Sequence, residues 1–141
     1  MVDLRRAIEM EKAARLIWEE AWKWFEAGKT TAEQLPIWSA NWMKAQLKLV
    51  KAKSDIITAY QDHLIRMQTM KEVTDRRFDA GATSEQQHQI GIYYVLEAEI
   101  WLEEAKAGAV GAAEAGAGQS TPAKDGGDAG KERSADGGVK K

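Results

Sequence analysis

The stretch Phe25-Glu-Ala-Gly28-Lys-Thr-Thr31 lies between two long segments of helically spaced apolar residues, and it occurs twice in the chain. Its second copy, Phe78-Asp-Ala-Gly81-Ala-Thr-Ser84, lies 53 positions further along. A glycine just after a helix readily takes the positive φ that reverses the chain, and Thr or Ser can cap the helix that follows. Each copy therefore predicts the tip of an antiparallel helical hairpin, with the turns at Gly28 and Gly81.

Helices are expected at about 3–27, 32–79 and 84–107, because apolar residues recur there every three or four positions. The first helix carries Ala7, Ala14 and Ala21 at heptad spacing, and small residues so placed let a partner helix approach closely. The last helix has its expected core line at Ile92, Val95, Ala98, Leu102 and Ala105.

The 53-residue shift relates two repeats, at about 1–53 and 54–107. It matches identical residues on both sides of each tip, among them Phe25 with Phe78, Gln34 with Gln87, and Ala45 with Ala98. We expect Thr30 or Thr31 to cap the helix after the first tip, and Thr83 or Ser84 to cap the helix after the second.

Two architectures fit this pattern. In the first, residues 32–79 form one helix of about 70 Å at 1.5 Å per residue, with the outer helices folded back along its two halves. In the second, the chain breaks near Ser54-Asp55 and the hairpins close into a four-helix bundle. The segment from Lys51 to Asp55 contains no Gly or Pro. The expected fold is therefore all-α, with tandem antiparallel helical hairpins sharing one long central helix.

The C-terminal residues 108–141 hold nine of the twelve glycines and no aromatic residue. This composition is typical of a disordered spacer or tether. The domain organisation expected is a helical-hairpin repeat domain over 1–107 followed by a disordered tail over 108–141.

Composition excludes several kinds of function. The formal net charge is −2 with both signs interleaved, which argues against a nucleic-acid partner. The chain has no cysteine, and its two histidines, His63 and His88, lie in no metal-binding spacing, so neither a metal nor a cofactor is expected. No catalytic residues are expected, because no nucleophile turn or glycine-rich phosphate loop is present.

No run of apolar residues is long enough for a transmembrane helix, and the N-terminal residues lack the apolar core of a secretory signal. A cytoplasmic location is expected for the chain as it stands, and an envelope or periplasmic one if upstream sequence has been removed.

Four of the six tryptophans lie symmetrically about the first tip: Trp18, Trp22, Trp38 and Trp42. In an antiparallel hairpin Trp22 meets the level of Trp38, and Trp18 that of Trp42. These indoles form either aromatic core layers or a partly exposed platform for a partner. Two helices cannot enclose all four, so another helix or another subunit must cover part of them. They are the candidate interaction surface.

The tips resemble the coiled-coil hairpins of TolC-like outer-membrane efflux proteins. The matching residues are Phe25, Gly28, Thr31, Leu35 and Ala45, with Phe78, Gly81, Ser84 and Ala98 in the second copy. The resemblance implies helical hairpins that pack side by side. The alternating segments of that family's barrel strands are missing from this chain.

The function expected is that of a non-enzymatic structural or interaction protein whose hairpins pack against copies of itself or against a protein partner. Two alternatives remain open at this point: a fragment of a TolC-like envelope component, and a small ligand-binding or enzymatic helical bundle. The second alternative requires polar groups that converge on a cavity beside the tryptophans.

Overall fold

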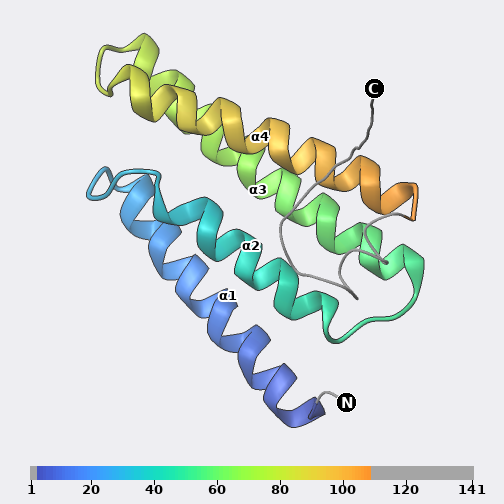
Figure 1. The fold of residues 1–141 in the computed structure, drawn as a ribbon. Helices are drawn as coiled ribbons and strands as arrows, with labels where there is room; N and C mark the ends of the chain where they lie inside the picture. The colour runs from blue at the N-terminus through green and yellow to red at the C-terminus, as the bar shows by residue number, and fades with distance from the viewer. Residues whose placement is uncertain (1–2, 109–141) are drawn as a thin grey trace, which may run out of the picture. The chain divides into compact units, whose positions relative to one another are not determined.

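Four α-helices build residues 3–108, the part of the chain that the computed structural model describes (Figure 1). They are α1 (Leu4–Glu26), α2 (Gln34–Leu47), α3 (Lys53–Asp79) and α4 (Glu85–Lys106), and no strand occurs within this range. The all-α class is confirmed. The tail expected over 108–141 lies outside the described residues, apart from Gly108.

Both predicted tips end their helices in the same way. Gly28 has a φ of 78° and Gly81 a φ of 70°. Behind each glycine the two hydrogen bonds of a Schellman motif form: the Gly28 amide donates to Phe25 O at 2.9 Å and the next amide to Trp24 O at 2.9 Å. The second tip repeats these bonds at Phe78 and Arg77. The hairpin turns are therefore confirmed.

The helix starts after the two tips differ from one another. Ser84 caps α4, since its Oγ accepts the Gln87 amide at 3.1 Å, as expected. The cap expected at Thr30 or Thr31 is wrong, because α2 begins only after Glu33 and has no side-chain cap. The Ala32 amide that precedes it is bound instead by a side chain of α4.

That side chain is Gln87, and it joins the two tips. Its Oε1 accepts the Ala32 amide at 2.9 Å, while its Nε2 donates to Glu33 Oε2 at 2.8 Å. From α3, Arg77 donates to the Phe25 carbonyl at 2.7 Å and lies over the Phe25 ring at 4.6 Å. The second hairpin thus supplies a partner for the Ala32 amide and a second donor for the Phe25 carbonyl, which already accepts the Gly28 amide.

The continuous central helix expected over 32–79 is wrong. Helix α2 ends at Leu47, and α3 begins at Lys53 after an extended Ala52. The break lies near the position of the alternative architecture, although no capping side chain marks it. Its physical cause is burial: folding back lets α3 cover apolar side chains of α1 and α2 that a continuous helix would leave in water.

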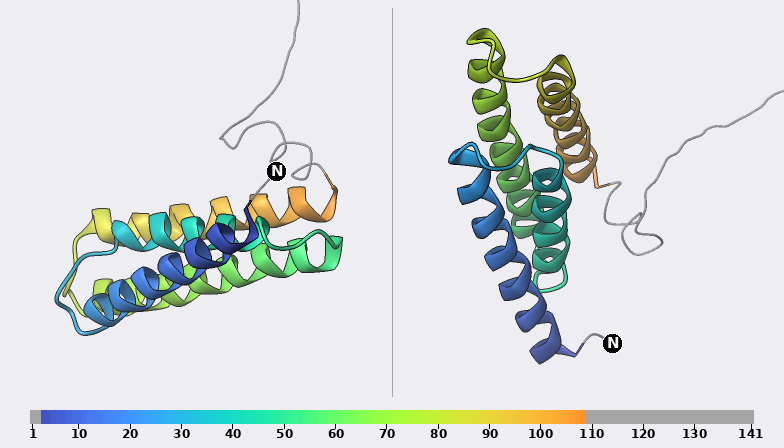
Figure 2. Two further views of the ribbon diagram at one scale, coloured as in Figure 1. Left: turned by 90° about the horizontal axis from the view of Figure 1, so that it is seen from below. Right: turned by 90° about the vertical axis from the view of Figure 1, so that its left-hand side faces the viewer.

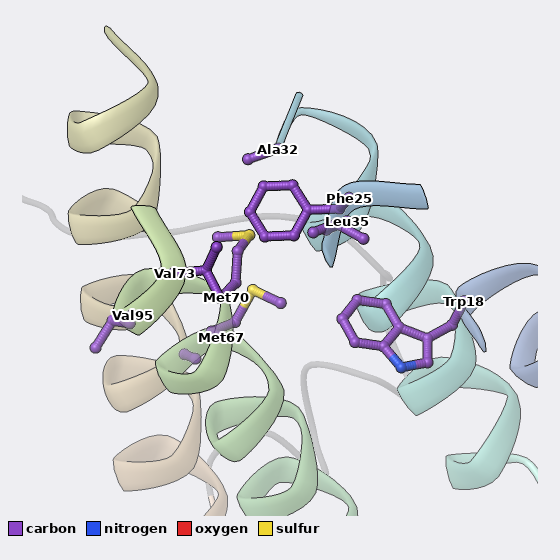
Figure 3. Close-up of a cluster of buried hydrophobic side chains, with 9 residues drawn as sticks. Trp18, Phe25, Ala32, Leu35, Met67, Met70, Val73 and Val95 are labelled. Carbon is purple, nitrogen blue, oxygen red and sulfur yellow. The ribbon is translucent and has the colours of Figure 1, made fainter. Parts of the chain in front are cut away.

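Because the chain reverses at 48–52, the helices run up, down, up and down, and both tips lie at the same end (Figures 1 and 2). The core forms where the two hairpins meet. Phe25 of α1 and Leu35 of α2 pack beside Met67 and Met70 of α3, and each of the four is at most 1% exposed (Figure 3).

Helix α4 approaches α3 closely at Gly91. A Cβ atom built there would lie 2.5 Å from Thr74 Oγ1 and 3.2 Å from the Lys71 Cα. The 53-residue shift places Trp38 at the corresponding position of α2. The two hairpins therefore have the same tips but different residues at this position, since one carries no side chain and the other an indole.

Candidate functional site

The structure buries one of the four tryptophans of the predicted set and leaves the other three partly exposed. Trp18 is only 7% exposed, and its ring stacks on Trp22 at 5.8 Å between centroids. Trp22, Trp38 and Trp42 are half-buried. Trp18 is therefore a core residue, as the first of the two interpretations expects, and it is not available on the surface.

Helix α3 covers the aromatic layer with Arg66. Its guanidinium lies 4.3 Å from the Trp42 ring centre and 5.8 Å from that of Trp18. The Trp42 indole nitrogen donates to Glu11 Oε2 at 2.7 Å, so its polar edge is paired as well. The cover that two helices alone could not provide comes from the second hairpin of the same chain.

A buried polar network lies next to these rings. Arg66 donates through Nε to Ser39 Oγ at 2.6 Å and through Nη2 to the Ser39 carbonyl at 3.0 Å. Ser39 Oγ in turn lies 2.7 Å from His63 Nδ1. Since Arg66 has only protons to give, Ser39 Oγ accepts from it and donates its own proton to His63. His63 is then a neutral imidazole that carries its proton on Nε2.

A serine beside a histidine can act as a nucleophile and base, but this pair lacks the properties required. Ser39 is 0% and His63 1% exposed, so no substrate reaches them. Burial, with the positive charges of Arg66 and Lys44, lowers the pKa of His63 to about 3, which makes it a poor proton acceptor. The network is a set of core contacts that joins α2 to α3.

Sequence reasoning missed this network. The signal for Ser39 was weak: it follows Leu35 and precedes Met43 at four-residue steps, on the line that α2 buries. Arg66 carries no such signal, because a long side chain can reach either the core or the solvent from its position. Gly91, which sets the approach of α4 to α3, was likewise not identified.

An open groove of about 300 Å³ lies elsewhere, beside the connection between α2 and α3. Glu11, Gln46, Asp55 and Asp62 are among its lining residues, and none of the four tryptophans of the predicted set lines it. Within residues 3–108, no group of three or more acidic or histidine side chains is placed to hold a metal ion.

The surface of α4 offers a different kind of feature. Tyr93, Leu96 and Ile100 are 59%, 53% and 53% exposed, and their spacing of three and four residues puts them on one line of the helix. The opposite line is buried against the bundle and contains Gly91, Val95, Ala98 and Leu102. The predicted core line is thus confirmed at Val95, Ala98 and Leu102. We call Tyr93, Leu96 and Ile100 the outer face of α4.

Charge is distributed unevenly around this face. From Glu85 to Glu103, α4 has four glutamates and no lysine or arginine. Glu99 and Glu103 are exposed, whereas Glu97 is half-buried and burial raises its pKa, an effect that the charge of Lys44 opposes. The outer face of α4 therefore combines three large apolar side chains with an acidic border.

Helix α1 also exposes apolar side chains: Leu4, Ile8, Met10, Leu16, Ile17 and Trp24. Met10, Ile17 and Trp24 share one side of the helix at seven-residue spacing, but successive members are two turns apart and charged residues of both signs lie between them. Apolar residues separated in this way are usual on protein surfaces. The outer face of α4 is the stronger candidate for binding.

Comparison of the chain with protein-family models, with curated proteins and with solved structures gives no match. The resemblance to TolC-like proteins therefore stays a prediction. No helix among the described residues is both long enough and apolar enough to cross a membrane.

Proposed function

We propose that this chain is a non-catalytic interaction module that binds another protein through the outer face of α4. The observation that carries the proposal is the exposed line of Tyr93, Leu96 and Ile100 on a helix whose opposite line is already buried. Helix-mediated binding usually uses anchor side chains of this kind, which lie three and four residues apart and contact the partner together.

The size of the face suggests a transient contact. Complete burial of a large apolar side chain contributes about 1.5–3 kcal/mol, so burying the exposed halves of three of them contributes roughly 3–4 kcal/mol. Micromolar binding needs about 8 kcal/mol and must also offset the lost freedom of the partners. The partner therefore has to add contacts beyond the apolar line.

An enzymatic or ligand-binding bundle is supported less well. It needs polar groups that converge on an accessible cavity, whereas Ser39, His63 and Arg66 bind one another in the core. No specific observation favours a TolC-like envelope fragment over an interaction module.

Site-specific photo-crosslinking tests the proposed function. A photoreactive phenylalanine analogue replaces Leu96 or Ile100 in the full chain, in cells that express it natively. A further variant carries the analogue at Ile65, which is 56% exposed on α3 and serves as the control. We expect a discrete adduct from positions 96 and 100 and none from position 65.

The protein found in that adduct must then bind the purified chain and lose affinity for Leu96→Gln/Ile100→Gln. Equal crosslinking from all three positions, or unchanged affinity of the double variant, would refute binding through α4.

A further inference from the structure

We infer that the outer face of α4 binds an amphipathic helix of another protein whose apolar stripe is bordered by lysine and arginine. This inference rests on the proposed function and adds the chemistry of the partner. It follows from the acidic border of the face, which neither α4 of a second copy nor the C-terminal residues of this chain complement.

The glutamates stand where they can meet the borders of a docked helix. Glu99 is three residues beyond Leu96, and Glu103 is three residues beyond Ile100, so each lies one helical turn from an apolar anchor. Glu97 is four residues beyond Tyr93 and is half-buried. A cation brought against it by a partner would offset the unfavourable burial of its charge.

A second copy does not fit the face with its own α4. Pairing two such helices brings glutamates against glutamates, since neither offers a lysine or arginine between Glu85 and Glu103. Like charges at an interface oppose association and select against that partner.

The C-terminal residues of the chain do not fit it either. Residues 109–141 contain no Leu, Ile, Met, Phe, Tyr or Trp, so they lack the large side chains that would cover the three anchors. A helix from a different protein, with a Leu or Ile stripe and basic borders, satisfies both the apolar and the charged part of the face.

The two parts have separate roles. Each exposed ion pair contributes up to about 1 kcal/mol, and salt screens it. The acidic border therefore determines which helix binds and how fast, while the apolar line holds the helix in place.

The experiment uses two synthetic helical peptides that share one Leu/Ile stripe and differ only in their borders, Lys/Arg in one and Glu in the other. Binding of each labelled peptide to the full chain is followed by fluorescence anisotropy at low and high salt. We expect the basic peptide to bind at least about tenfold more tightly than the acidic one, and to weaken as salt rises.

Three variants show which residues of the chain are responsible for peptide binding. Leu96→Gln/Ile100→Gln is expected to weaken the basic peptide by about tenfold or more, and Glu99→Gln/Glu103→Gln to reduce the difference between the peptides. Ile65→Gln/Glu72→Gln makes the same kinds of change on the exposed side of α3 and leaves both affinities unchanged. Circular dichroism melts verify that all variants fold.

Each remaining outcome contradicts the inference. If both peptides bind equally and both need Leu96 and Ile100, the partner chemistry is wrong and the proposed function stands. If the basic peptide binds independently of Leu96 and Ile100, its binding is only general attraction to acidic surface. Binding of neither peptide, or self-association that depends on Leu96 and Ile100 in light scattering, also refutes the basic partner.

Discussion

His63 is a buried residue that makes the stability of the bundle depend on pH. Its Nδ1 accepts from Ser39 and its ring stacks on Trp101 at 5.4 Å, but the buried Nε2 has no hydrogen-bond partner among the described residues. The ring packs in the core in its neutral form. A second proton would place a charge beside Arg66 and Lys44, and the lowered pKa of His63 expresses that penalty.

Stability is expected to fall as the pH drops below about 6.5. The unfolded chain then protonates His63 while the folded chain, in which the pKa is about 3, does not. Protons therefore favour unfolding, and the free energy of unfolding decreases by about 1.4 kcal/mol per pH unit down to about pH 3. Urea titrations followed by circular dichroism measure this slope between pH 5 and 6, above the range where most carboxylates titrate.

His63→Gln is expected to flatten that slope, because glutamine does not titrate. The same slope in His63→Gln as in the parent would show that burial of this histidine does not govern the pH dependence.

At the scale of helices, the two tips have the same backbone turn but make different contacts. Both end in the same glycine turn, but only the second hairpin contributes Arg77 and Gln87 to the other. Under the 53-residue shift these residues correspond to Trp24 and Gln34, which are exposed. The two turns come from residues that the repeats share. The contact from Arg77 comes from a position where the repeats differ in sequence, and the contact from Gln87 from a position where the same residue has a different environment.

Gln87→Ala is expected to destabilise the bundle by about 1–2 kcal/mol, because the Ala32 amide loses its buried partner. The effect is local at first, so hydrogen exchange of the Ala32 amide accelerates more than exchange in the middle of α3. Gln89→Ala, an exposed change on the same helix, is the matched control. Unaltered exchange at Ala32 in Gln87→Ala would contradict the joined tips.

For the molecule as a whole, the reversal at residues 48–52 decides which surfaces are buried. With the hairpins closed, Met67 and Met70 are 0% exposed and Trp18 is covered, while Trp22, Trp38 and Trp42 stay half-buried. Among the large apolar side chains that stay exposed, Tyr93, Leu96 and Ile100 form the closely spaced line of the outer face of α4. Of the predicted interaction surface only Trp18 is buried, and the closely spaced exposed line lies on the second hairpin.

Spin labels at Lys29→Cys and Ala82→Cys test this closure, since the chain has no other cysteine and both positions are exposed. A continuous helix over 32–79 would hold the tips about 70 Å apart. The joined tips predict a distance well below half of that in double electron–electron resonance. A population near 70 Å would instead restore the extended architecture.

Much of the fold could be predicted because its signals are local. The tips require a residue that tolerates positive φ, and Gly28 and Gly81 supply it within a few residues of Phe25 and Phe78. The buried line of α4 follows from helical spacing alone. The buried polar network was less predictable, since Ser39 and His63 are 24 residues apart and meet only when α2 and α3 pack.

The sequence by itself determined the first and last helices, the two turns and the 53-residue register, because each depends on side chains close together along the chain. Only the tertiary structure decided that the chain breaks between Leu47 and Lys53, where no Gly, Pro or capping side chain stands. The reason is that burial of α1 and α2 against α3 is a property of the closed bundle, and it outweighs the continuity of a helix that local sequence favours.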